Sequence, residues 1–477
     1  MPSGAAASIL EALQDIVQEL SESHKASNVA EQIIANVKCT MSDRASAQKS
    51  FNALLEEYRA SILPTVTANW DSLTTNEKQS MSQMYNFYCG MHLIVNMAEH
   101  TSEALKLIEK NYPDTTSVAF TSDNEPGTIR LIRTACKAFE KRGDEKSGCP
   151  LQFASYLKRK GIVNNPLIHF KGNRFNVIFA NGARIFYLHT HIVDFLQNVW
   201  GTPNRLLKAV LEDASNTNYI AGCKALGIID KVITRPLWRI LESDIHILNI
   251  PDYYFKLKTF FSECTVQNIG AIAKGEKTPF GIDLVNTDEI WVSLCAPTQL
   301  DSVVQHILLS LFKTFEVLLE RVLIDHQPVL TAAAENRQEV TFQTRTVKPT
   351  NTISERDFGK LDRLLREKPN ASTLAIEAYI MFSNNKTSKW LDAKSNEEKE
   401  KLFAEARRNA PKHRQKYRQH ISELEEQRRK SQIQKQKEKE ESEKRRMEMK
   451  EKITSELTSY GLYLLLKWIY QSESHEV

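Results

Sequence analysis

Apolar residues recur at three- and four-residue spacing through the region 128–337, and this periodicity constrains the fold more than any other feature of the sequence. The clearest runs extend over 179–196 and 303–322. Such spacing is typical of helices that bury one face. Strand patterns are thin, and the best candidates are 167–170 and 290–294. The sequence therefore predicts a helical domain over this whole region.

Upstream, one acidic side chain stands at the junction of two elements. An apolar run closes at Val37, and from Ala47 to Tyr58 apolar residues recur at helical spacing, so Asp43 lies at or just before a helix N-terminus. An Asp in this place is most often an N-cap that accepts backbone N–H groups. A carboxylate at the end of an element is also what a metal-dependent phosphoryl-transfer enzyme needs, because Mg²⁺ prefers oxygen ligands. The local pattern leaves both interpretations open.

A second motif follows an aromatic run. Tyr85 to Tyr88 is typical of a short buried strand or turn, and the residues from His92 to Ile108 predict a long helix. Cys89 and His92 are either two metal ligands or a buried thiol and a hydrogen-bonded imidazole. The second interpretation is favoured, because no further Cys/His pair lies nearby to close a zinc site.

The third motif is a carboxylate within an apolar helix. Glu377 has Leu374, Ile376, Tyr379 and other apolar residues around it. Burying a lone carboxylate is costly, so Glu377 must be partnered, ligate a metal, or point out of the core. The last of these is the ordinary role of a Glu on an amphipathic helix.

These motifs together resemble the later two-thirds of a cut-and-paste DNA transposase of the hAT-like type. The resemblance implies a ribonuclease-H-like catalytic core with three metal-binding acids, interrupted by a large helical insertion. Asp43 matches the second acid, which follows a strand, and Glu377 matches the third, on a helix beyond the insertion. The resemblance also makes Cys89, His92 and Arg174 residues of the family motifs.

The chain departs from this family in two ways. The family's first acid lies on a strand upstream of the second, but the residues before Asp43 predict helices, with Asp15 on an amphipathic face. The family's N-terminal zinc finger has no matching Cys/His quartet. We therefore expect a transposase-derived remnant without catalysis, and no cofactor unless an intact acidic site binds Mg²⁺.

The C-terminal region differs in composition from the rest. Residues 412–452 contain 15 Lys and Arg against 9 Glu, a local net charge of +6 (15 − 9). This predicts a long exposed helix that is either simply solvated or makes a non-specific electrostatic contact with DNA. A coiled-coil seam is poorly supported, because apolar a and d positions are not sustained. The candidate nucleic-acid-binding residues are Arg428, Arg429, Lys430, Lys444, Arg445 and Arg446.

The chain as a whole shows no sign of secretion or of a membrane span. Its seven cysteines lie singly without a Cys-x-x-Cys pair, which is typical of a reducing compartment. The N-terminus has no secretory pattern, and the longest apolar stretch, 461–470, is too short to span a bilayer. The apolar residues of 455–477 still need burial, so they either dock back or mediate self-association. We expect an intracellular protein with no membrane partner.

The sequence thus predicts a mostly α protein with a partial ribonuclease-H-like α/β core, a large helical insertion and a long charged C-terminal helix. Its function is predicted to be that of a nuclear, DNA-associated, catalytically inactive transposase derivative. The alternative is a helical scaffold, nuclear or cytoplasmic, that binds proteins and not DNA. The predicted segments are the first core part (1–110), a loop (111–127), the helical insertion (128–337), a connector (338–352), the second core part (353–408), the charged helix (409–454) and the apolar tail (455–477).

Overall fold

The protein forms two units, which are described separately. The computed structural model describes residues 6–23, 28–111, 125–170, 172 and 175–473. One unit contains Leu20–Ser354, and the other contains Met1–Glu19 together with Glu355–Val477. Nearly all of the regular structure is helical, which confirms the mostly α class.

A two-stranded parallel sheet provides the α/β part of the larger unit. Strands β1 (Cys39–Ser42) and β2 (Tyr85–Tyr88) pair in parallel, with Cys39 opposite Tyr85 and Ser42 opposite Tyr88. The connection between them contains α3 (Ser46–Val66), η1 (Trp70–Ser72) and α4 (Thr75–Ser82), and α2 (Val29–Ala35) precedes β1. This is a β-α-β arrangement, and its assignment to a ribonuclease-H-like core remains a prediction.

A fully buried arginine contacts the segments that lead into both strands. Arg59 of α3 donates to the carbonyl oxygens of Ala35 at 3.1 Å, Ser82 at 2.9 Å and Met81 at 2.7 Å. These carbonyls lie where α2 and α4 end, and terminal helix carbonyls have no partner within their own helix. One guanidinium therefore fixes both helix ends beside the sheet.

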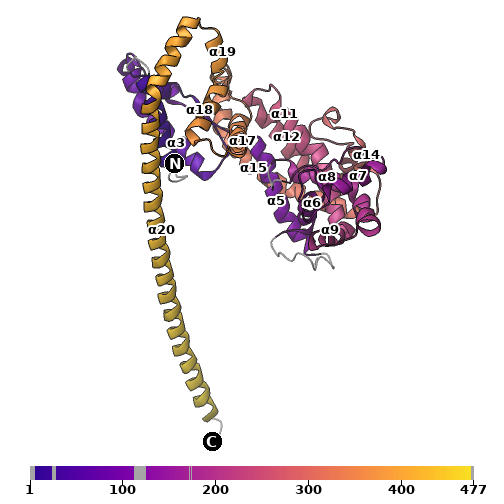
Figure 1. Ribbon diagram of the computed structural model, residues 1–477. Coiled ribbons are helices and arrows are strands. Elements are labelled where there is room, and N and C mark those ends of the chain that lie inside the picture. Colours follow the sequence, from indigo (N-terminus) through magenta and orange to yellow (C-terminus); the bar gives the residue numbers. More distant parts are fainter. Residues whose placement is uncertain (1–5, 24–27, 112–124, 171, 173–174, 474–477) are drawn as a thin grey trace. The chain divides into compact units, whose positions relative to one another are not determined.

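The remaining helices of this unit form a large body between β2 and residue 349. Figure 1 shows α6, α7, α8, α9 and α14 gathered in one bundle. The helices are α5 (Met91–Glu109), α6 (Gly127–Phe139), α7 (Pro150–Arg159), α8 (Val177–Asp194), η2 (Phe195–Val199), α9 (Arg205–Ser215), α10 (Thr217–Ile229), η3 (Asp230–Thr234), α11 (Arg235–Glu242), η4 (Ile247–Asn249), α12 (Ile250–Ser262), α13 (Ile269–Ala273), η5 (Ile282–Leu284), α14 (Glu289–Cys295), α15 (Asp301–Glu335) and α16 (Arg337–Thr344).

The centre of this body is α10, in which every residue from Tyr219 to Ile229 is buried. It packs along α8. A Cβ added at Gly227 would lie 2.7 Å from the Cα of Ala183 on α8, so only glycine allows the two backbones to approach this closely. Because α10 is buried on every side, it has no polar face, as is typical of a helix at the centre of a large core.

The chain returns from the helical body to the point at which it left the sheet. The N–H of Gly90, just after β2, donates to the carbonyl of Pro349 at 2.9 Å. The N–H of Asn351 donates to the Cys89 thiol at 3.3 Å. All helices from α5 to α16 therefore lie between two segments that are hydrogen-bonded to each other.

Neither of the two strand candidates in this region is a strand. Ile290 to Leu294 belongs to helix α14, where Asp288 caps the N-terminus by accepting the N–H of Trp291 at 2.9 Å. The segment 167–170 is not a strand either.

The alternating stretch at the end of the insertion, expected as a connector, contains helix α16. Val340 and Thr344 are buried one helical turn apart, whereas Phe342 is 61% exposed. A strand would have placed all three side chains on one face.

The second unit contains α1 (Ala6–Ser23), α17 (Thr352–Glu367), α18 (Thr373–Asn384), α19 (Thr387–Asp392) and α20 (Asn396–Glu473), the first and second of which cross its boundary. The 78-residue helix α20 confirms the long C-terminal helix (Figure 1). Val17 of α1 is buried, and Glu19 pairs with Lys416 of α20 at 3.1 Å. In the expected apolar tail, the side chains of Leu457 and of residues 462–473 lie outside the described part. Within the described residues, no helix is both long and apolar enough to cross a bilayer.

Candidate functional site

The carboxyl ends of β1 and β2 bring together several polar side chains. Asp43 follows β1 directly, and Cys89 follows β2 directly. In open α/β sheets, ligands bind outside the carboxyl ends of parallel strands. The C-terminal half of α15 also reaches this place, with Asp325 and His326.

Asp43 caps the turn before α3. Its side chain is exposed, and its Oδ1 accepts the N–H of Ala45 at 3.0 Å. The N-cap of α3 is Ala45 itself, which offers no side-chain oxygen. The carboxylate of Asp43 thus stabilises the turn that leads into α3. That it also binds a metal ion remains a prediction.

Arg44, the next residue, ties this loop to α15. Its guanidinium pairs with the carboxylate of Asp325 and donates to the carbonyl of Arg321 at 3.1 Å. Lys49 of α3 also reaches Asp325, at 3.0 and 2.8 Å from its two oxygens. These contacts hold Arg44 in a left-handed backbone conformation, φ 72°, which non-glycine residues rarely adopt. Arg44 therefore fixes the loop and is not a free cation.

Cys89 and His92 do not form a metal site within the described residues. Cys89 is 2% exposed, and its thiol accepts the N–H of Asn351. His92 is half-buried, and its Nδ1 makes no hydrogen bond to any described residue. No group of three or more His, Cys, Asp or Glu in the described ranges could hold a metal ion.

A buried histidine lies beneath the loop. The ring of His326 is 3% exposed and makes edge contacts with Tyr88 and Tyr254, at centroid distances of 6.4 and 5.6 Å. Burial and the positive charge of Arg44 lower the pKa of His326 to about 4, against the opposing effect of Asp325. The imidazole is therefore neutral near pH 7. The sequence offered one sign of it, because His326 lies on the buried stripe of α15 with Val322 and Val329.

Glu377 lies in the other unit. It is exposed on α18 and makes no ion pair with any described residue, whereas Ile376 beside it is buried. The side chain thus points out of the helix core, which was one of the alternatives considered. The resemblance implies that Asp43 and Glu377 contribute to one metal site, and this stays a prediction. Arg174 lies outside the described residues.

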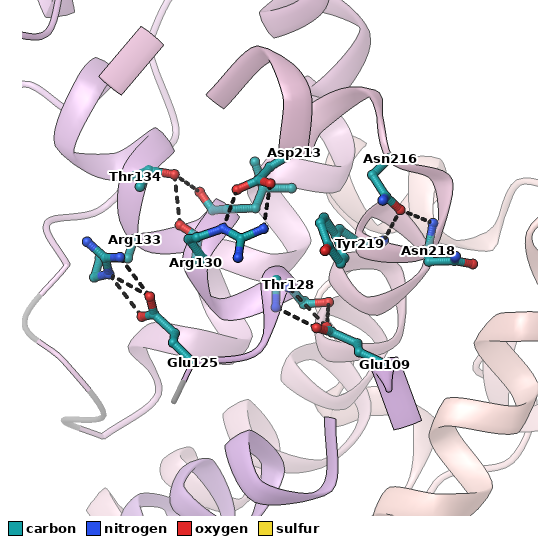
Figure 2. A network of polar contacts seen from close by, with 12 residues as sticks. Glu109, Glu125, Thr128, Arg130, Arg133, Thr134, Asp213, Asn216, Asn218 and Tyr219 are labelled. Atoms are coloured by element: carbon teal, nitrogen blue, oxygen red, sulfur yellow. Dashed lines mark hydrogen bonds and ion pairs between the residues drawn. The ribbon is translucent and has the colours of Figure 1, made fainter. Parts of the chain in front are cut away.

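A second polar cluster surrounds the start of α6 (Figure 2). Buried Glu109, at the end of α5, accepts the N–H and hydroxyl of Thr128 at 3.0 and 2.6 Å. Arg130 and Asp213 form a buried two-pronged ion pair at 2.9 and 2.8 Å. Every charge in this buried pair is matched, and Glu109 satisfies the first N–H groups of α6. The cluster therefore holds α5, α6 and α9 together.

The candidate nucleic-acid-binding residues of α20 are all exposed. Three of them are paired with glutamates of the same helix: Arg429 and Lys430 with Glu426, at 3.3 and 3.9 Å, and Arg445 with Glu441, at 3.7 Å. Exposed pairs of this kind are weak, but each reduces the free positive charge of the helix.

No family model matches the chain, and no curated protein or solved structure matches it either.

Proposed function

We propose that this chain is a transposase-derived nuclear protein that associates with DNA and does not catalyse strand transfer. Helix α20 carries the proposal, because its region 412–452 has a net charge of +6 on mostly exposed side chains. Cations that neutralise DNA phosphates release counterions, which gives binding without sequence preference. Cytoplasmic location is the alternative.

The origin from a transposase is supported by the order of elements around the small sheet. Asp43 stands between β1 and α3, as the resemblance requires of a second acid, and the Cys89-x-x-His92 motif directly follows the adjacent strand. A large helical body then intervenes before the helix that carries Glu377.

The absence of catalysis is argued from charge. Two Mg²⁺ ions bring four positive charges, and two-metal phosphoryl transfer needs carboxylates that hold both ions about 4 Å apart. Asp43 and Glu377 together supply only two negative charges. Because Mg²⁺ sheds its water reluctantly, we expect low occupancy of a site made from these two residues.

Salt-dependent retention of duplex DNA by the purified chain tests the proposal. We expect binding at about 50 mM salt that weakens by roughly 0.9 log units per log unit of salt for each phosphate contacted. Failure to bind at low salt would remove the proposed DNA association.

A second candidate is a helical scaffold that binds other proteins. It is favoured by the apolar side chains on α18, where Tyr379, Met381 and Phe382 are 52%, 54% and 44% exposed. Contiguous exposed apolar side chains often mark protein interaction sites. This candidate predicts no retention of DNA at any salt concentration, so the same assay separates the two.

A further inference from the structure

The cations of α20 are unevenly distributed relative to its acids. No Asp or Glu occurs between Glu405 and Glu423, and we call residues 406–422 the acid-free segment. Farther along α20, cations are interspersed with glutamates. The acid-free segment contains six Lys and Arg residues, namely Arg407, Arg408, Lys412, Arg414, Lys416 and Arg418.

Five of these six cations are free of ion pairs. Lys416 pairs with Glu19 of α1, but the other five are exposed and make no ion pair or side-chain hydrogen bond with any described residue. Their charge is therefore not cancelled locally. This contrasts with Arg429, Lys430 and Arg445, which face glutamates one helical turn away.

The helix places three of the arginines in one row. Arg407, Arg414 and Arg418 are separated by seven and four residues, so they lie on one face of a helix with 3.6 residues per turn. At 1.5 Å per residue the row is about 17 Å long. The half-buried side chains of Tyr417, Ile421 and Leu424 border one edge of this row, whereas the three arginines themselves are exposed. The arginine row is thus left open to a ligand.

The same spacing brings like charges together. Arg408 and Lys412 are four residues apart, as are Arg414 and Arg418, and like charges at this spacing destabilise a helix. An anion bound along the row removes the repulsion between Arg414 and Arg418. The segment is therefore better suited to a bound polyanion than to free solution.

The chemistry of the segment fits a phosphate backbone. Four of the five free cations are arginines, whose planar guanidinium groups bind phosphate through two hydrogen bonds. Duplex DNA presents one negative charge per about 1.7 Å of its axis, so several phosphates fall within the row. A membrane-surface helix instead needs a broad apolar face beside its cations, and no large apolar side chain is exposed from 406 to 422.

We propose that the acid-free segment is the main phosphate-binding surface of α20, and that it binds the backbone of duplex DNA through Arg407, Arg408, Lys412, Arg414 and Arg418. This inference rests on the proposed DNA association and assigns the main DNA contact to the acid-free segment. It moves the main contact from residues 428–446 toward the N-terminal part of the helix.

The test compares the full chain with two variants that lose the same charge. In the first variant the five free cations of the acid-free segment are changed to Gln. In the second, the five changes are Arg428→Gln, Arg429→Gln, Lys430→Gln, Arg445→Gln and Arg446→Gln. Glutamine is a good helix former, so circular dichroism should show unchanged helix content.

Binding to a fluorescent duplex of mixed sequence is measured between about 50 and 200 mM salt. We expect the first variant to lose at least about tenfold in affinity and to show a shallower salt slope, by roughly 0.9 for each phosphate contact removed, and the second to lose much less. A third variant, in which the four arginines are changed to Lys, should keep the salt slope of the unaltered chain. It keeps the positive charge at the same positions, so it distinguishes loss of charge from misfolding.

Three outcomes would overturn the inference. Equal or larger loss in the second variant would place the main contact at 428–446 and leave the proposed function intact. No binding by the unaltered chain would remove the proposed function as well. Binding to vesicles that contain phosphatidylserine, without binding to the duplex, would assign the segment to a membrane surface.

Discussion

At the scale of single residues, two buried polar side chains hold the small sheet in place. Arg59 satisfies three carbonyl groups at one end of the strands, and neutral His326 lies under the loop at the other end. Both act through burial, so their contribution to stability is testable without an assay of function.

Replacing Arg59 with Leu should lower the free energy of unfolding by about 2–4 kcal/mol. The carbonyls of Ala35 and Ser82 then lose this partner, whereas the carbonyl of Met81 keeps a hydrogen bond from Lys38 at 3.1 Å. An unsatisfied acceptor costs about 1–3 kcal/mol before relaxation. Urea unfolding provides the measurement. Arg159→Leu, at an exposed position of α7, is the control and should change stability by about 0.5 kcal/mol or less. Equal effects of the two changes would contradict the role assigned to Arg59.

His326 should make the protein less stable in mild acid. Its pKa is about 4 in the folded chain, against about 6.5 when unfolded, so between these values the unfolded state binds the additional proton. The contribution of neutral His326 to the free energy of unfolding is fully present above about pH 6.5 and is lost as the pH falls toward about 4. We expect the unaltered chain to lose about 2 kcal/mol more than His326→Phe between pH 7.5 and pH 5. Parallel pH profiles of the two proteins, in urea unfolding, would exclude this role.

The sequence could place these residues on buried faces, but it could not identify their partners. His326 follows the buried periodicity of α15, and Phe51, Leu55 and Tyr58 already indicated the helix that contains Arg59. The pairing of Arg44 with Asp325 joins residues far apart in the chain, and no local spacing encodes such a contact.

At the scale of elements, the three- and four-residue spacing of apolar side chains predicted the helices reliably. The long helix expected after the aromatic run is α5, and the run itself is β2. The apolar stretch at 290–294 is too short for periodicity to separate a strand from a helix. In the structure it is helical, and Asp288 caps its N-terminus.

The buried pair Arg130–Asp213 joins α6 to α9, and breaking one side of it should be costly. Asp213→Leu leaves Arg130 buried without a counter-charge, so we expect a loss of about 3–5 kcal/mol in urea unfolding. Adding Arg130→Met should recover much of this loss, because two apolar side chains replace the pair.

The half-exposed pair Arg133–Glu125 in the same cluster provides the comparison (Figure 2). Glu125→Gln should cost about 1 kcal/mol or less, because solvent screens such pairs. The double variant Asp213→Leu/Arg130→Met could instead prove as unstable as Asp213→Leu alone. The ion pair would then contribute more to the free energy of unfolding than the apolar side chains that replace it.

At the scale of the whole molecule, the two acids assigned by the resemblance belong to different units. The sequence could order these acids along the chain. It could not establish a shared site, because a site requires spatial proximity and a complete set of ligands.

We expect no Mg²⁺- or Mn²⁺-dependent nicking of supercoiled DNA by the purified chain, because two carboxylates cannot balance two divalent ions. The measurement is conversion of supercoiled to relaxed plasmid. Nicking that disappears in Glu377→Gln would show that a third acid exists, and Asp15 or a residue of 354–362 would then be the first to examine.

The hydrogen bond between Gly90 and Pro349 also bears on the order in which the protein folds. Joining two points about 260 residues apart in a disordered chain costs about 5 kcal/mol of loop-closure entropy, whereas one backbone hydrogen bond contributes about 1 kcal/mol. This contact therefore cannot nucleate folding. We infer that the helical body forms first and shortens the effective loop, after which residues 349–351 close against the end of β2. In pulsed hydrogen exchange, the amides of α8 and α10 should gain protection before the amide of Gly90.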